Sequence, residues 1–179
     1  MAEVLSAKTN VPQVLVAPVD PLNGPTALNL PFLAQRIYTM AQERLAELDP
    51  ERFTRQTLTR LWAADPGLLL LMFLDPANGK ILGHVVAEIC TDGVKKWLFV
   101  HQTKADGNVG DAVKRALGIL DEWAQSDLVR GLAPRGVACT VMTMATHRND
   151  AAWQRKYGLE AHRQVLMRDI GSPVGAEAK

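Results

Sequence analysis

Three apolar runs separated by turn-forming residues fill the middle of the chain and constrain its fold most strongly. The run 68–74 (LLLLMFL) is followed by DPANGK, and the run 81–89 is followed by TDG, after which a third run covers 96–102. Such turns reverse the chain within a few residues, so consecutive strands joined by them pair in antiparallel fashion. The sequence therefore predicts a three-strand antiparallel meander.

One strand and two helices are predicted ahead of the meander. Their bounds are 13–19 for the strand and 31–48 and 50–64 for the helices, with a loop at 21–25. Pro18 confines the end of the strand to a sheet edge, because proline cannot donate to a strand ladder. Asp49 followed by Pro50 is a strong helix start, with a capping side chain and then a proline at the first helical position.

A helix, a strand, a short helix and a last strand are predicted after the meander. They are expected at 109–126, 137–145, 150–157 and 160–170, in a domain over 11–170 between an arm (1–10) and a tail (171–179). Asp106 or Asn108 should cap the long helix, and Leu117 and Leu120 should lie on its buried stripe. A helix joining two strands indicates a parallel crossover. The predicted fold class is therefore α/β, a mixed sheet with helices on both faces.

The composition argues against several classes of partner. The 179 residues include 20 basic and 19 acidic side chains, so no net charge favours nucleic acid or a membrane surface. No apolar run approaches the ~20 residues of a membrane helix, and we expect no signal peptide. Cys90 and Cys139 lie in apolar runs, as buried reduced thiols do, and no metal site is expected. A soluble cytoplasmic protein is the resulting expectation.

This order of elements, with two local patterns, resembles the GNAT family of acetyl-CoA-dependent N-acetyltransferases. One pattern is KWLFVHQTKADGNVGDAVKRALGILDEWA, a strand, a glycine-containing loop and an amphipathic helix. The other is NDAAWQRKYGLE, which is similar to the family's final helix and its closing glycine. The resemblance covers about residues 11–170 and implies the acyl-CoA N-acyltransferase fold, with the meander followed by helix, strand, helix and strand.

The resemblance implies an acetyl-CoA site where the last meander strand meets the long helix. The first N–H groups of a helix have no internal partners and lie in positive potential, so they can hold a pyrophosphate. Residues that match this place are Lys104, Asn108, Val109, Gly110 and Asp111. They are the expected cofactor-binding residues.

The loop departs from the family pattern at two positions. The family has Arg or Gln, two residues, Gly, one residue, then Gly or Ala. Gly110 matches the last position, whereas Ala105 stands for the basic or amide residue and Asn108 for the first glycine. Asp106 and Asp111 also place acidic charge beside the expected phosphates, which repels a bound anion.

The resemblance also implies positions for the catalytic groups. Many members use a tyrosine of the final helix as general acid; Gln154 stands at the matched position, and Tyr157 is nearby. The general base is commonly a Glu or His of the central strands, or a water that they hold. His101 is the best placed by pattern, and Glu88 and His84 follow, since they share one face of their strand.

Two hypotheses for function follow. The altered loop favours a GNAT-like structural or interaction protein without acyl transfer, with protein partners in an assembly or a homo-oligomer. In this respect the chain resembles small proteins encoded by bacteriophages, some of them virion-associated. The alternative is an active N-acetyltransferase, in which an amine acceptor attacks the thioester of acetyl-CoA directly and backbone groups polarise the carbonyl.

Overall fold

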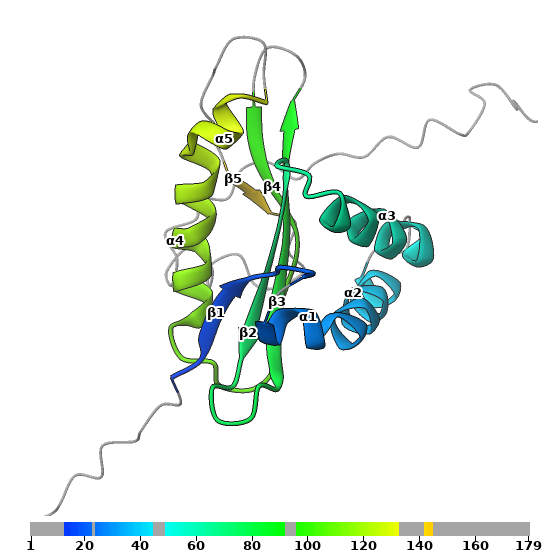
Figure 1. The fold of residues 1–179 in the computed structure, drawn as a ribbon, viewed down its shortest axis with the longest axis vertical. Coiled ribbons are helices and arrows are strands. Elements are labelled where there is room, and N and C mark those ends of the chain that lie inside the picture. The colour runs from blue at the N-terminus through cyan, green and yellow to red at the C-terminus, as the bar shows by residue number, and fades with distance from the viewer. Residues whose placement is uncertain (1–12, 23, 45–48, 92–95, 133–141, 145–179) are drawn as a thin grey trace, which may run out of the picture. The chain divides into compact units, whose positions relative to one another are not determined.

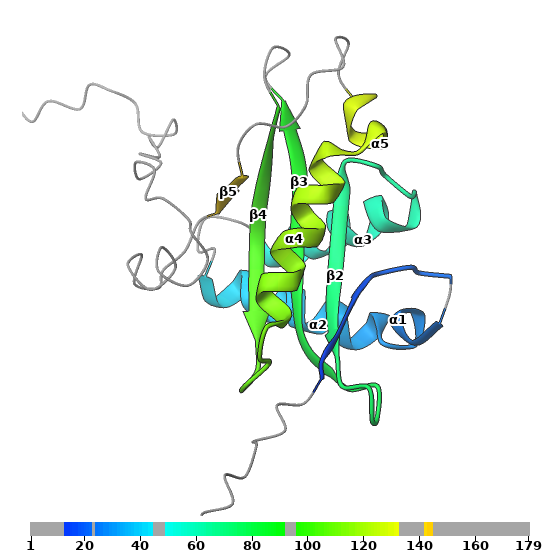
Figure 2. The same cartoon turned by 90° about the vertical axis from the view of Figure 1, so that its left-hand side faces the viewer.

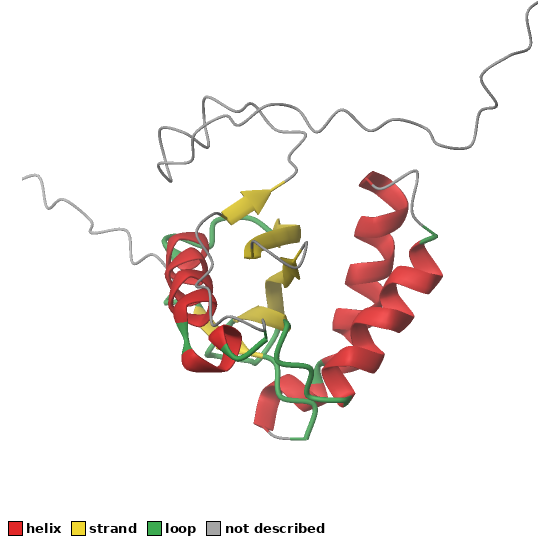
Figure 3. Cartoon of the chain, turned by 90° about the horizontal axis from the view of Figure 1, so that it is seen from above, coloured by secondary structure: helices red, strands yellow, loops and turns green. Residues whose placement is uncertain are grey.

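A five-stranded sheet organises the described part of the chain, with helices on both of its faces (Figure 1, Figure 3). This computed structural model describes residues 13–22, 24–44, 49–91, 96–132 and 142–144, all within the unit Met1–Ala145. The strands are β1 (Leu15–Pro18), β2 (Leu68–Leu74), β3 (Ile81–Thr91), β4 (Lys96–Ala105) and β5 (Met142–Met144). The helices are α1 (Gly24–Leu28), α2 (Leu30–Arg44), α3 (Pro50–Trp62), α4 (Ala112–Gln125) and α5 (Asp127–Arg130).

The predicted antiparallel meander is confirmed. β2 pairs antiparallel with β3, and β3 pairs antiparallel with β4. Between β2 and β3 the turn is closed by backbone hydrogen bonds from Asp75 N to Lys80 O (2.9 Å) and from Gly79 N to Asp75 O (2.7 Å). β4 extends beyond the predicted end, to Ala105, so the strand leads directly into the glycine-containing loop.

The parallel crossover is also confirmed for the described part of the strand predicted at 137–145. β5 pairs parallel with β4, with Leu98 opposite Met142 and Val100 opposite Met144. α4 and α5 connect these two strands, and α4 runs along one face of the sheet (Figure 2). The expected last helix, last strand and tail, together with Tyr157, lie outside the described residues.

The N-terminal elements follow the prediction closely, with one addition. β1 is an edge strand, as Pro18 requires. At the start of α3, Asp49 accepts hydrogen bonds from the backbone N–H groups of Glu51 (3.0 Å) and Arg52 (3.1 Å). The expected loop at 21–25 is wrong in its second half, because a short helix, α1, begins at Gly24. Thr26 stabilises it locally by donating to Asp20 O at 3.0 Å.

The long helix starts later than predicted. α4 begins at Ala112 with Asp111 as its N-cap residue, so neither Asp106 nor Asn108 is the cap. The reason lies in the two preceding glycines, since Gly107 has φ +65° and Gly110 has φ +57°. Both values lie in the left-handed region that glycine adopts without strain, so the chain turns through this segment before it becomes helical.

The buried stripe of α4 is displaced from the predicted one. Leu120 is fully buried as expected, but Leu117 is only half-buried. Ala112, Ala116 and Ala124 take the central positions of the stripe. These alanines face the sheet, so Leu117 lies at the edge of the interface between α4 and the sheet.

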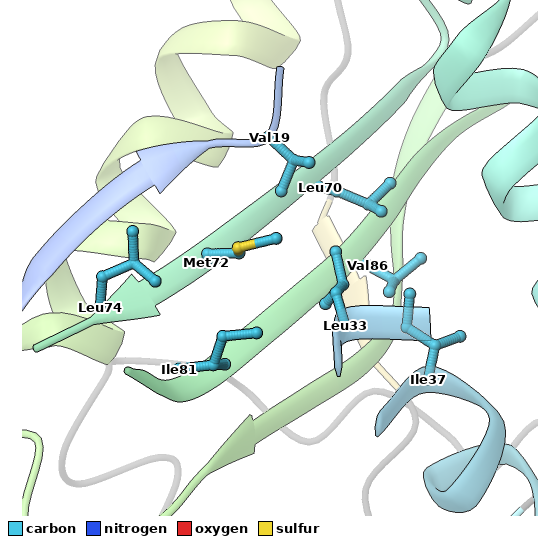
Figure 4. Close-up of a cluster of buried hydrophobic side chains, with 8 residues drawn as sticks. All are labelled: Val19, Leu33, Ile37, Leu70, Met72, Leu74, Ile81 and Val86. Atoms are coloured by element: carbon cyan, nitrogen blue, oxygen red, sulfur yellow. The ribbon is translucent and has the colours of Figure 1, made fainter. Parts of the chain in front are cut away.

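A hydrophobic core fills the space between the sheet and α2 (Figure 4). Its buried members are Val19, Leu33, Ile37, Leu70, Met72, Leu74, Ile81 and Val86. Phe53 and Leu61 of α3 pack against the same cluster. This core holds α2 and α3 against one face of β2 and β3, and the polar groups described next lie on the same face of the sheet.

Candidate active site

A β-bulge in β4 gives the candidate site its geometry. Val86 of β3 lies opposite Gln102, but the next residue, Ala87, lies opposite Val100, so His101 is the extra residue. A bulge of this kind sends two successive side chains toward the same face and bends the strand. His101 therefore points toward α3, where its ring contacts Phe53 (5.4 Å between centroids), and Gln102 reaches α2.

His101 and Glu88 form the central pair of the site. His101 Nε2 lies 2.8 Å from Glu88 Oε1, and their side chains are 19% and 23% exposed. The hydrogen bond from His101 is the largest cause that lowers the pKa of Glu88 to about 2, and Arg60 adds to it. Glu88 is therefore a carboxylate at neutral pH and accepts the Nε2 proton. In the neutral imidazole this leaves Nδ1 as the atom that can accept a proton.

Aromatic rings enclose this histidine on two sides. Phe99 of β4 meets the His101 ring edge-to-face, with centroids 4.6 Å apart, and Phe53 of α3 meets it at a tilt. Such contacts fix the orientation of the imidazole and reduce its access to water. The arrangement, a half-buried histidine oriented by a carboxylate, is one that suits general acid–base chemistry.

Glu88 is held in turn by Arg60 of α3. Arg60 Nη1 donates to Glu88 Oε2, and Arg60 Nε donates to Asp65 Oδ2 at 2.7 Å. Asp65 lies in the turn that leads from α3 into β2, where its Oδ1 accepts from Gly67 N at 2.8 Å. Charged groups thus extend from the turn through Arg60 and Glu88 to His101.

His84 is the remaining candidate for the general base, and its environment differs from that of His101 and Glu88. Its side chain is fully buried under α2, and its Nε2 lies 3.1 Å from Gln102 Oε1. Gln102 Nε2 donates to Ile37 O at 3.1 Å, so its oxygen is free to accept the His84 Nε2 proton. Burial lowers the pKa of His84 to about 4. His84 is therefore a neutral residue of the core that connects the sheet to α2.

The glycine-containing loop lies at the end of the same strand. Lys104 is half-buried on β4, and the loop continues through Asn108, Val109 and Gly110 to Asp111. The Asn108 side chain accepts a hydrogen bond from Gly110 N at 3.0 Å, so one of the N–H groups expected to bind phosphate already has a partner. His101 and Ala105 are four residues apart on β4, which corresponds to roughly 13 Å of extended chain.

Both acidic side chains of the loop are paired with arginines. Asp106 Oδ2 accepts from Arg36 Nη1 of α2 at 2.7 Å, and this contact is the largest cause that lowers the pKa of Asp106. Asp111 Oδ1 accepts from Arg115 Nε at 3.1 Å instead of capping the helix. The negative charge that argued against a phosphate beside the loop is therefore largely offset by neighbouring positive charge.

Sequence reasoning placed Glu88 and His101 among the candidates but missed the groups around them. The bulge has a weak signal, since the polar pair His101–Gln102 interrupts an alternating strand. Arg60 and Asp65 have no such signal in the sequence, because only the packing of α3 on the sheet brings them near Glu88.

Among the described residues, no cluster of His, Cys, Asp and Glu could hold a metal ion. No helix in the described ranges is long and apolar enough to cross a membrane.

Comparison with known proteins finds similarity at the level of structure. No protein-family model matches the chain, and no curated protein matches it. Glucosamine-6-phosphate N-acetyltransferase from Arabidopsis thaliana superposes with a TM-score of 0.56 at 10% identity, over 89% of this chain and 99% of that one. An aminoglycoside N-acetyltransferase solved in complex with CoA gives 0.56 at 12% identity, over 88% and 95%.

A further neighbour is an aminoglycoside acetyltransferase from an uncultured soil metagenomic sample, solved in complex with sisomicin. Its TM-score is 0.54 at 11% identity, and the match covers 90% of this chain and 97% of that chain. At such identities the likeness establishes the fold alone. The chain has the mixed α/β fold of the GNAT acetyltransferases, as its element order predicted.

Proposed function

We propose that this protein is an N-acyltransferase that moves an acetyl group from acetyl-CoA to an amine, with His101 as general base and Glu88 as the group that orients it. The observation that carries the proposal is the 2.8 Å contact between His101 Nε2 and Glu88 Oε1 at the bulge of β4. A base held by a carboxylate, on the strand that leads into the glycine-containing loop, can take the proton that the amine loses during acyl transfer.

In this mechanism the amine nitrogen attacks the thioester carbonyl carbon, and the carbon–sulfur bond breaks to release the CoA thiolate. His101 Nδ1 takes a proton from the attacking amine. Glu88 keeps its hydrogen bond to Nε2 and stabilises the imidazolium that forms, as a carboxylate beside a catalytic histidine does. Tyr157 stays a candidate for protonation of the thiolate.

The acyl donor would be held by the loop and the first turn of α4. Val109, Gly110 and Asp111 supply backbone N–H groups there, and Lys104 supplies positive charge. The arginine partners of Asp106 and Asp111 support this assignment, because they reduce the repulsion of a phosphate. A phosphate that uses the Gly110 N–H group has to displace the Asn108 side chain.

The hydrogen bond from Gly110 N to the Asn108 side chain also favours a second candidate function, that of a scaffold. A loop whose asparagine occupies the phosphate-binding N–H group is consistent with a GNAT-fold scaffold that has lost its acyl donor. Such a protein acts through partners in an assembly, as some bacteriophage virion proteins of this fold class would.

Two measurements decide between these functions. Calorimetry with CoA tests donor binding, and thiol release from acetyl-CoA with a panel of amines, including an aminoglycoside, tests transfer. The enzyme hypothesis predicts binding and turnover in the wild type, with turnover lost but CoA binding kept in His101→Gln. The absence of both at millimolar CoA, with the protein folded, would establish the scaffold instead.

A further inference from the structure

Arg60 contacts the Glu88 carboxylate at the oxygen that His101 does not use, and Asp65 holds Arg60 from the other side. Arg60 Nη1 donates to Glu88 Oε2, whereas His101 occupies Glu88 Oε1, so the two oxygens of one carboxylate hold different partners. The guanidinium is fixed at its other end, because Arg60 Nε donates to Asp65 Oδ2 at 2.7 Å. Planar, multiply bonded guanidinium–carboxylate pairs keep their geometry better than single contacts do.

The position of Arg60 is itself determined by three elements. It lies in the last turn of α3, its Nη2 reaches Gly67 O, and Asp65 belongs to the turn between α3 and β2. Gly67 O also accepts from Ile89 N of β3 at 2.9 Å, next to Glu88 in the chain. The guanidinium therefore connects the helix, the turn and the strand that carries the carboxylate.

We propose that Arg60 and Asp65 are positioning residues for His101. Arg60 fixes the Glu88 carboxylate so that Oε1 accepts the Nε2 proton of the imidazole, which leaves Nδ1 unprotonated and able to take a proton from the acceptor amine. Asp65 keeps Arg60 in place. The inference rests on the proposed function for its kinetic part, whereas the effect on the imidazole tautomer is independent of it.

The alternative is that Arg60 only stabilises the turn after α3. The two roles can be distinguished by experiment. Loss of a residue that only stabilises the turn lowers the unfolding free energy but leaves the tautomer of the His101 imidazole in the folded protein unchanged. Arg55 provides a matched control, since it lies on the same helix and its side chain is 69% exposed and paired only with Glu51 at 3.9 Å in the described structure.

The experiment compares wild type, Arg60→Ala, Arg60→Lys, Asp65→Asn and Arg55→Ala. Nitrogen-15 spectra of labelled histidine, with the His101 signals identified from His101→Gln, report the fraction of neutral imidazole protonated on Nε2. We expect Nε2–H to dominate in wild type and in Arg55→Ala, and Nδ1–H to increase in Arg60→Ala. Asp65→Asn, which keeps an acceptor for Gly67 N, should give an intermediate result.

Kinetics of the same proteins complete the test. Positioning predicts a fall in kcat on the order of tenfold or more in Arg60→Ala, with KM for acetyl-CoA unchanged. Added guanidinium ion at millimolar concentration should restore part of the kcat of Arg60→Ala, and Arg60→Lys should retain a higher kcat than Arg60→Ala.

An unchanged tautomer in folded Arg60→Ala overturns the inference, as does a changed tautomer with normal turnover. Wild type without turnover refutes the proposed function, and the tautomer result then stands separately.

Discussion

Glu88 contacts His101 although the strand register places Phe99, not His101, directly opposite it. Phe99 and His101 alternate to the same face of β4, so His101 reaches Glu88 diagonally and its Nε2 lies 2.8 Å from Oε1. A regular strand would have sent His101 and Gln102 to opposite faces of the sheet. The bulge between Val86 and Ala87 therefore brings Gln102 onto the face that already carries His101 and Glu88, and so creates the buried contact of Gln102 with α2.

The coupling of these two residues is measurable by a double-mutant cycle. Glu88→Gln removes the charge that orients His101, and His101→Gln removes the base itself. If the two act as a unit, each single variant should lower kcat by ~10²-fold or more, and the double variant should be little worse than the poorer single one. Independent effects that multiply in the double variant would contradict this pairing.

Glu88→Gln should also destabilise the folded protein. Arg60 is 35% exposed and Glu88 23% exposed on their side chains, so the loss of the charge leaves a partly buried guanidinium with one carboxylate partner instead of two. We expect a loss of roughly 1–3 kcal/mol in unfolding free energy, below the range for fully buried pairs. Urea unfolding measures it, with Glu51→Gln at the exposed pair as the control, for which the change should stay within about 0.5 kcal/mol.

The stability of the protein should fall as the pH is lowered, first through His84. The pKa of His84 is about 4 in the folded protein against 6.5 as its ordinary value. The unfolded chain therefore binds more protons between these two values, and folding loses free energy as the pH falls from 6.5 toward 4. The whole window corresponds to roughly 3 kcal/mol.

A glutamine at position 84 tests this assignment. Gln can donate to Gln102 Oε1 as the histidine does, but it does not titrate. Urea midpoints of His84→Gln should change less between pH 7 and pH 5 than those of wild type. The pKa of Glu88, lowered from 4.5 to about 2, acts in a lower window and affects that comparison little. Equal pH dependence in the two proteins would contradict the buried neutral state of His84.

The buried stripe of α4 gives a prediction with an internal control. Leu120 is fully buried and Leu117 is half-buried on the same helix. Leu120→Ala should cost ~2–5 kcal/mol in unfolding free energy, as cavity-making substitutions do. Leu117→Ala should cost clearly less, because its side chain already contacts water. A larger loss at Leu117 than at Leu120, measured by denaturant unfolding, would contradict the observed face of the helix.

The parts of this fold that the sequence predicted are those with local causes. The bounds of β2 agree with the prediction because DPG and DPANGK turn the chain on either side of it, and α3 begins where Asp49 and Pro50 start a helix. The start of α4 was missed because two glycines with positive φ leave the onset of the helix undetermined by pattern.

The candidate site shows the limit of local patterns more sharply. Arg60 and Glu88 are 28 residues apart in the chain, and their contact depends on how α3 packs on β3. His101 was a candidate by its residue type and strand position alone. A single extra residue in β4 places Gln102 on the same face as His101, and a one-residue change of register reverses the face of every side chain beyond it.

Asn108 is the residue whose substitution should separate the two proposed functions. Its side chain accepts from Gly110 N at 3.0 Å, so Asn108→Gly frees that N–H group and also restores the glycine that the GNAT pattern has at this position. A hydrogen bond from a backbone N–H group to a charged phosphate contributes ~1.5 kcal/mol or more, so CoA should bind about tenfold more tightly, as calorimetry at low salt would detect.

Two further substitutions complete this test of the loop. Asn108→Asp keeps an acceptor for Gly110 N and adds negative charge, so it should weaken CoA binding. Gly110→Glu should abolish it, because its side chain and charge would occupy the phosphate position. The φ of +57° at Gly110 also makes any side chain there strained, so circular dichroism and a thermal melt have to confirm that the Gly110→Glu variant is folded.

Equal CoA affinities in Asn108→Gly, Asn108→Asp and wild type would place the acyl donor elsewhere. If none of these proteins binds CoA at millimolar concentration, the loop is only a helix start and the scaffold hypothesis is correct.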